Sequence, residues 1–324
     1  RSTLFPYTTL FRSPYSLAFG PDGNLRPYDL GQPTGVPYIV QGGESYRSAQ
    51  YKNLLADTER VLGTVLFDYD LSDSLRLFSE GYFSQVKSRT QNNEPNYNTS
   101  LNNAAGQPGG NIVLSLDNPF LAPAARQTIA DYLGSTGTLD DPNTFLLTRS
   151  NGDLTPGDTR AKIDLWRVVT GLQGDLPIGS RSFTWELAFN YGRSTAANSE
   201  PALLRQNFLN AIDAVRATDG SIVCRPGAQS ADYPALSSTC APLNLFGQGA
   251  PSRAAVDYIS TFAHSRSVNT QRVITASLQG ELVDLPGGAL RGVLGYESRR
   301  ESAMFDVDTI WRSEERRVGK ECRS

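Results

Sequence analysis

A strict alternation of apolar and polar side chains between residues 183 and 192 restricts the folds open to this chain more than any other feature. The sequence reads FTWELAFNYG, so the odd-numbered side chains are large and apolar or aromatic and the even-numbered ones are small or polar. Successive side chains of a β-strand point to opposite faces. The segment therefore predicts a strand with one greasy, aromatic face.

Similar alternating segments occur in pairs joined by short stretches of turn-forming residues, so we expect three antiparallel hairpins. Their strands cover 60–70 with 75–87, 161–173 with 183–192, and 270–283 with 289–301, and their turns cover 71–74, 174–180 and 284–288. Further strands are expected near Tyr38 and Ile310. A short helix is expected at Pro123 to Leu133 within the first long connection.

The connections between the hairpins are far longer than the turns inside them. Residues 88–157 and 195–267 each form a stretch of roughly 70 residues, well beyond an ordinary loop. Short turns at one end of the strands and long loops at the other are the organisation of an outer-membrane barrel. The alternative for any single strand is a half-buried sheet in a soluble protein.

These features predict an all-β fold, an antiparallel up-and-down transmembrane β-barrel that is partial. Three hairpins supply six strands, and the smallest closed membrane barrels use about eight. We therefore expect an open curved sheet of about 6–8 strands with long extracellular loops. Phe183, Trp185, Leu187 and Phe189 should point away from the barrel axis. Glu186 and Asn190 should point inward, and aromatic girdles are expected to include Trp185, Tyr191, Tyr82 and Tyr296.

The two ends of the chain are related in an unusual way. One DNA sequence encodes RSEERRVGKECRS at residues 312–324, and its reverse complement encodes RSTLFPYTTLFRS at residues 1–13. This DNA resembles a short-read sequencing adapter, so both ends are interpreted as translated adapter. The expected division is therefore 1–13 adapter, 14–311 a fragment of a barrel domain and 312–324 adapter.

The remaining body is acidic. The whole chain has 30 basic and 33 acidic residues, of which the two ends contain seven and three. The body therefore keeps 23 basic and 30 acidic residues, a formal net charge of −7. A nucleic-acid partner is therefore not expected. No run of about 18 apolar residues is present, which argues against a membrane helix. Cys224 and Cys240 remain once Cys322 is set aside, and they suit an oxidising compartment.

Signs of catalytic or metal chemistry are weak. Asp68, Asp70 and Ser72 begin like a calcium loop, but Asp73 stands where glycine is required and Ser79 where glutamate is required. His264 is the single histidine and is read as a solvated loop residue, although Asp257 and Ser260 lie nearby in sequence. We therefore expect no enzyme activity, no cofactor and no metal, and the ligand-binding residues stay unknown.

Several phrases resemble those of TonB-dependent receptors, and together they span nearly all of residues 14–311. They are LAFGPDGNLRPYDLG at 17–31, LDNPFLAPAARQTI at 116–129, CAPLNLFGQGAPSRAAVDYI at 240–259 and LRGVLGYESRRES at 290–302. The resemblance implies a large barrel in the outer membrane of a Gram-negative bacterium, filled by an N-terminal plug. It also implies energised import of a scarce nutrient, either a siderophore, a cobalamin-like molecule or an oligosaccharide.

The family also implies partners: outer-membrane lipid, a small-molecule ligand, and TonB acting through a region missing from this chain. A disulfide between Cys224 and Cys240, closing an extracellular loop, fits the family phrase that begins at Cys240. Two alternatives stay open on the residues, a passive porin or outer-membrane adhesin and, more remotely, a soluble all-β binding protein. A plug domain encoded upstream would distinguish a TonB-dependent receptor from a porin or adhesin.

Overall fold

The computed structural model describes residues 17–29, 31–36, 40–44, 53–91, 112–136, 143–147, 149, 151–154, 157–226, 240–247 and 249–310. The expected adapter ends lie outside these residues. The chain divides into two compact units. We call them the sheet unit (54–90, 158–200 and 263–324) and the connection unit (the remaining residues), and each is described by itself.

The sheet unit is built on six long strands. They are β5 (Asp57–Ser72), β6 (Leu75–Gln91), β9 (Asp158–Ile178), β10 (Arg181–Leu203), β13 (Ser260–Leu285) and β14 (Gly288–Val307). Their spatial order is β14-β13-β10-β9-β6-β5, so each strand lies beside its neighbour in sequence within this sheet. The three hairpins are antiparallel, and the sheet is open, with β5 and β14 as its edges. The predicted antiparallel, up-and-down open sheet is confirmed.

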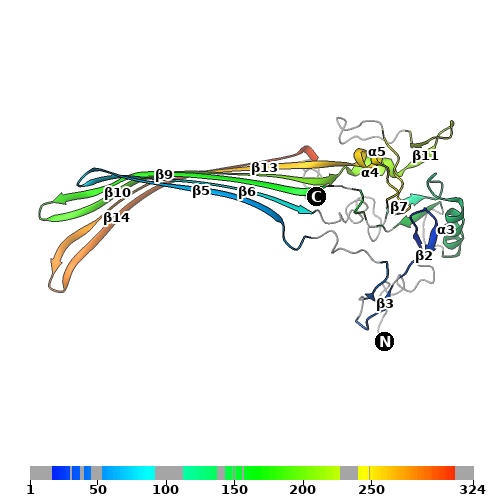
Figure 1. Cartoon of the computed structure of the whole chain (residues 1–324), viewed down its shortest axis with the longest axis horizontal. Helices are drawn as coiled ribbons and strands as arrows, with labels where there is room; N and C mark the ends of the chain where they lie inside the picture. The colour runs from blue at the N-terminus through cyan, green and yellow to red at the C-terminus, as the bar shows by residue number, and fades with distance from the viewer. Residues whose placement is uncertain are drawn as a thin grey trace, which may run out of the picture. The chain divides into compact units, whose positions relative to one another are not determined.

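The hairpin turns are shorter than the sequence suggested, and all three lie at the same end of the sheet (Figure 1). The predicted turn 174–180 shrinks to Gly179 and Ser180, because cross-strand pairing continues to Ile178 and Arg181. Gly179 has a φ of 66°, the left-handed conformation that a tight turn needs. Continued pairing also satisfies backbone groups that a longer loop would leave to water.

Two expected strands do not join this sheet. Val40–Gln41 (β4) pairs with Gln32–Pro33 (β3) in a separate two-stranded sheet, and residues 37–39 lie outside the described part. Ile310 lies in a helical turn after β14. The prediction of a strand at Ile310 is therefore wrong, whereas Tyr38 itself lies outside the described residues. Within the described part, the main sheet has six strands.

The strand registers give the sheet two chemically different faces. Phe183 is paired with Leu176 and Leu187 with Leu172, while the neighbouring Glu186 is paired with Gln173. In the last hairpin Ala276 is paired with Tyr296 and Leu278 with Leu294. The ring of Phe183 fills the space over Gly280, which puts the apolar sides of β10 and β13 on one face. We call this the apolar face and the opposite one the polar face.

Tyr82 is the exception among the predicted girdle aromatics. The ring of Phe78 fills the space over Gly171, which is paired with Ala188 on the polar face. Tyr82 lies four residues after Phe78 on β6 and so shares that face. The prediction for Tyr82 is wrong because both faces of β6 carry aromatic residues, so its alternation does not reveal which side is apolar.

The connection unit has small sheets and helices of its own. They are β1 (Leu17–Phe19) with β2 (Leu25–Pro27), β3 with β4, β7 (Ile112–Ser115) with β8 (Thr144–Leu147), β11 (Ala214–Arg216) with β12 (Ile222–Cys224), α3 (Pro123–Thr136), α4 (Arg205–Ile212) and α5 (Arg253–Ile259). The helix expected at 123–133 is confirmed as α3. Among the described residues, no helix combines the length and apolar character of a membrane span.

One apolar core holds this unit together. Its largest fully buried apolar side chains come from both long connections: Ile112, Leu154, Phe208, Leu243 and Ile259. Burial of several such side chains, at about 1.5–3 kcal/mol each, gives the connections a reason to fold. Both connections therefore contribute structured segments to one body.

Candidate functional site

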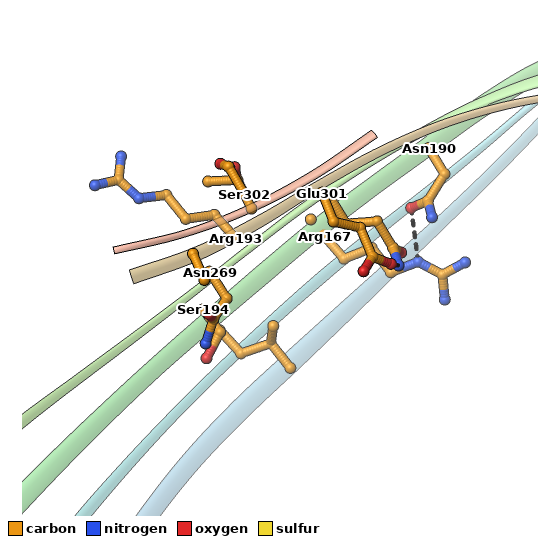
Figure 2. Close-up of a pocket in the computed structure, with 12 residues that line it drawn as sticks. Arg167, Asn190, Arg193, Ser194, Asn269, Glu301 and Ser302 are labelled. Atoms are coloured by element: carbon orange, nitrogen blue, oxygen red, sulfur yellow. Dashed lines mark hydrogen bonds between the residues drawn. The ribbon is translucent and has the colours of Figure 1, made fainter. Parts of the chain in front are cut away.

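A hollow of about 570 Å³ lies on the polar face of the sheet, lined by four strands (Figure 2). β9, β10, β13 and β14 contribute Leu165, Arg167, Asn190, Gly192, Arg193, Ser194, Asn269, Thr270, Gln271, Glu301, Ser302 and Ala303. Three consecutive residues of each of β10, β13 and β14 line the hollow: 192–194, 269–271 and 301–303. Because successive side chains of a strand point to opposite faces, the middle residues Arg193, Thr270 and Ser302 contribute backbone to the hollow and direct their side chains to the apolar face. The wall itself is rich in amides, hydroxyls and charges.

Hydrogen bonds across the strands hold these polar groups in place. Arg167 Nε donates to Asn190 Oδ1 at 2.9 Å, and Gln271 Nε2 donates to Glu301 Oε1 at 2.7 Å. Next to the hollow, Arg299 lies 3.0 Å from Glu297 and 3.7 Å from Glu301. Positive and negative groups therefore alternate along this face. Such a surface can exchange hydrogen bonds with water or with a polar solute.

The apolar face has the opposite character. Leu187 and Phe189 are 46% and 42% exposed, and on β14 Leu294 and Tyr296 are 73% and 65% exposed. A soluble protein rarely leaves so many large apolar side chains exposed side by side. Exposed apolar groups on one face and charged groups on the other invert the arrangement expected of a sheet in water.

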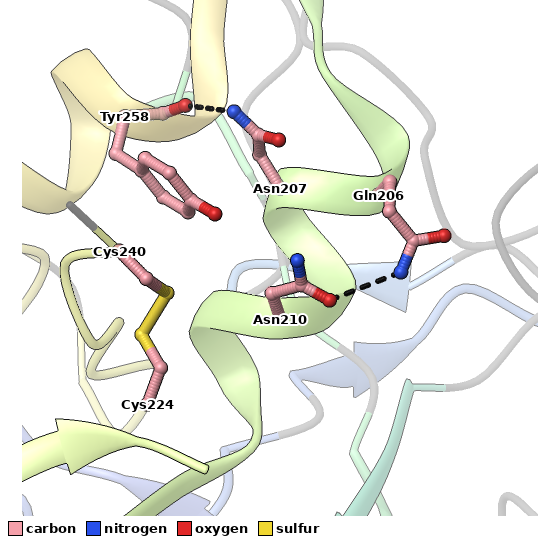
Figure 3. Close-up of a disulfide and its surroundings, with 6 residues drawn as sticks. All are labelled: Gln206, Asn207, Asn210, Cys224, Cys240 and Tyr258. Atoms are coloured by element: carbon pink, nitrogen blue, oxygen red, sulfur yellow. Dashed lines mark hydrogen bonds between the residues drawn. A yellow bond between two sulfur atoms is a disulfide. The ribbon is translucent and has the colours of Figure 1, made fainter. Parts of the chain in front are cut away.

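Cys224 and Cys240 form a disulfide with their Cα atoms 6.2 Å apart (Figure 3). The bond joins the end of β12 to the segment that begins at Cys240, and residues 227–239 lie outside the described part. Beside it, Arg225 Nε donates to both oxygens of Asp213 at 3.0 and 2.9 Å. In the same region Asn207 Nδ2 donates to Tyr258 O at 2.8 Å, which ties α4 to α5.

Arg149 organises a buried cluster that the sequence did not reveal. Its two terminal nitrogens donate to the two carboxylate oxygens of Asp153, each at 2.7 Å. Its Nε and Nη2 also donate to the carbonyls of Leu245 and Gly247, at 3.2 and 3.0 Å. Asp153 accepts from the amide of Gly249 at 3.0 Å. The cluster therefore fastens residues 245–249 to residues 149–153.

The environment of Asp153 keeps it ionised. Burial raises the pKa of this carboxyl, but the hydrogen bonds and charge of Arg149 outweigh burial and hold the pKa below its usual range. The only sign of this cluster in the sequence was the four-residue spacing between Arg149 and Asp153, and such a spacing is common in proteins. The cluster forms because Arg149 and Asp153 also bind the backbone of Leu245, Gly247 and Gly249, nearly a hundred residues away. A local sequence pattern does not encode such a contact.

The candidate catalytic and metal-binding residues pair with other side chains. His264 lies within β13, so its placement in a loop is wrong, although its side chain is 66% exposed. Its Nδ1 is 3.8 Å from Asp308 Oδ2, whereas Asp257 pairs with Arg253 at 2.9 Å. Asp70 is paired with Arg76. Within the described part of the chain, no three histidine, cysteine or carboxylate side chains gather in a metal-binding group.

Comparisons with known proteins add little. No family model matches the chain, and no curated protein matches it. Among solved structures it is similar to the siderophore receptor PiuA from Acinetobacter baumannii, with 11% identity and a TM-score of 0.23. The match covers 77% of this chain and 30% of that one, so the chain spans less than a third of that receptor. Strand order and register define the fold of this chain.

Proposed function

We propose that this chain is part of an outer-membrane TonB-dependent receptor that imports a scarce nutrient. The observation that carries the proposal is the opposition between an exposed apolar face and a charged face along β9, β10, β13 and β14. In a barrel the apolar side contacts lipid and the polar side lines the lumen. The long connections suit a receptor, because folded external segments can bury a ligand.

The strand lengths fit this placement. The six strands run from 16 to 26 residues, whereas a membrane crossing needs about 9–11 residues at a tilt near 45°. The excess length lets strands project beyond the bilayer on the side of the long connections. Outer-membrane lipid is then the partner of the apolar face, and TonB acts through a part of the receptor outside this chain.

The nutrient belongs to the siderophore, cobalamin-like or oligosaccharide class. The chemistry of the lumen face supports binding through hydrogen bonds rather than catalysis, and the transport reaction needs no cofactor. Within the described part of the chain, the hollow lined by β9, β10, β13 and β14 is equipped to contact a polar solute. Its amides and paired charges suit hydroxyl- and carbonyl-rich molecules.

The test is to express the full-length gene product in its host and follow both its location and nutrient uptake. We expect it in the outer-membrane fraction, and we expect uptake of one nutrient class to stop when either this gene or TonB is deleted. Recovery in the soluble fraction would refute the membrane assignment. Uptake that continues without TonB, through a product with no plug domain, would instead support a passive porin.

A further inference from the structure

Three arginines lie together on the apolar face, where charges are otherwise costly. Arg272 on β13 is directly paired with Arg300 on β14. The guanidinium of Arg272 lies over the ring of Tyr191, 5.6 Å from its centre. Arg193 follows Tyr191 by two residues on β10 and so shares its face. We call Arg193, Arg272 and Arg300 the arginine patch.

The patch carries positive charge that the described part of the protein does not neutralise. Two like charges directly opposite in an antiparallel pair repel and are destabilising. Among the described residues, no carboxylate lies within ion-pair distance of any of the three guanidinium groups. Asp164, on the same face of β9, is already occupied by Lys162 and by Gln85. By contrast Arg299, adjacent to Arg300 but on the polar face, is flanked by two glutamates.

The surroundings are those of a boundary between polar and apolar regions. The hydroxyls of Thr270 and Ser302 lie 2.6 Å apart beside the patch. The rings of Trp166 and Tyr191 lie 5.1 Å apart at its edge. Towards the hairpin turns the same face continues with exposed Ile274, Leu294 and Tyr296. An aromatic pair between cations and an aliphatic surface is the pattern found where a protein meets the lipid headgroups.

The three arginines also lie at one level. Arg193 lies thirteen residues after Ser180, Arg300 thirteen after Gly287 and Arg272 fourteen before Pro286. At about 3.3 Å per residue and a tilt near 40°, this places them roughly 33 Å above the turns. The apolar band of such barrels is about 25 Å tall. The patch therefore lies at the edge of the band on the side of the long connections.

We propose that the arginine patch binds the phosphate of an anionic lipid headgroup, whose acyl chains cover the apolar face below it. The inference rests on the proposed membrane location. Guanidinium groups suit phosphate oxygens because they donate several hydrogen bonds in a fixed plane. A bound phosphate also removes the repulsion between Arg272 and Arg300. A lipid fits better than a free anion because the patch continues into an exposed aliphatic surface.

The experiment uses the full-length gene product in a zwitterionic detergent, with retained lipid counted by native mass spectrometry. Dioleoyl phosphatidate and dioleoyl phosphatidylcholine are added separately, and inorganic phosphate is added as a competitor. Wild-type protein should retain phosphatidate in preference to phosphatidylcholine. We expect Arg272→Gln and Arg300→Gln each to weaken phosphatidate binding about fivefold, the effect of one cation near an anionic lipid surface.

Arg299→Gln is the matched control, since it removes the same charge from the same strand on the opposite face and should leave retention unchanged. A shift in electrophoretic mobility on heating confirms folding of each variant. If neither Arg272→Gln nor Arg300→Gln folds, salt titration of the wild type decides, because phosphatidate retention should fall with salt whereas phosphatidylcholine retention should not. Equal retention of both lipids, equal loss in Arg299→Gln, or complete displacement by millimolar phosphate would overturn the proposal. A product absent from the outer-membrane fraction would instead refute the proposed function.

Discussion

At the scale of single residues, the bond between Cys224 and Cys240 is the best-defined constraint on the connection unit. Cys224→Ser removes the disulfide and should lower the free energy of unfolding by about 3 kcal/mol. This is the chain-entropy value for the loop that the bond closes, whose ends are 16 residues apart in sequence. Urea unfolding of the purified protein with and without reductant measures this loss. Thiol alkylation with peptide mapping provides the control, and label on Cys224 or Cys240 in the native, unreduced protein would contradict the bond.

Arg149 should be far more sensitive than an exposed arginine. Its side chain is 7% exposed, so Arg149→Ala leaves Asp153 charged, partly buried and without its main donor. We expect a loss of about 3–5 kcal/mol in the free energy of unfolding. Arg253→Ala is the control, because the Arg253–Asp257 pair is exposed and should contribute less than about 1 kcal/mol. Similar losses of unfolding free energy in the two variants would show that the buried cluster stabilises the protein no more than an exposed ion pair.

The same cluster predicts an acid-sensitive connection unit. The pKa of Asp153 is lower in the folded protein than its ordinary value of 3.8. The stabilisation is therefore complete above pH 3.8 and is lost as the pH falls through the lower folded-state pKa. Unfolding midpoints measured from pH 7 down to acid should show this loss. Asp153→Asn should reduce the slope, and an unchanged slope would assign the acid sensitivity to other carboxylates.

At the scale of elements, the two faces of β10 should tolerate charge very differently. Leu187 and Glu186 are neighbours on one strand, but Leu187 belongs to the apolar face and Glu186 to the polar face. Leu187→Arg should cost about 2–4 kcal/mol on folding into a bilayer, whereas Glu186→Arg should cost little. Folding yield into phosphatidylcholine vesicles, read from the heat-dependent gel shift, compares them. Equal yields would mean that the apolar face does not contact lipid.

At the scale of the whole molecule, the open sheet limits what the isolated chain can do. Strands β5 and β14 are edges, so their outer backbone groups have no neighbouring strand within this sheet. Exposed edges next to an apolar face favour association with other copies. We expect the isolated chain to form oligomers in detergent, detected by light scattering, and to show no transport in proteoliposomes. A stable monomer would contradict this expectation.

The sequence by itself determined the central part of each of the six strands and which residues of β10 share a face, although β10 and β13 extend into the predicted connection 195–267. Both follow from a local repeat of two residues and from turn-forming residues between repeats. The repeat failed for Tyr82, because β6 carries aromatic residues on both sides. It also overestimated all three turns, since turn-forming residues mark a turn but cross-strand pairing decides how far the strands extend.

Only the tertiary structure decided which distant groups meet. Arg149 reaches the carbonyl oxygens of Leu245 and Gly247, 96 and 98 residues away. The guanidinium of Arg272 lies over Tyr191 on a strand from another hairpin. Contacts of this kind depend on the register between hairpins and on the fold of the connections. Backbone pairing and burial of distant segments fix both, so a local pattern of residues carries no record of them.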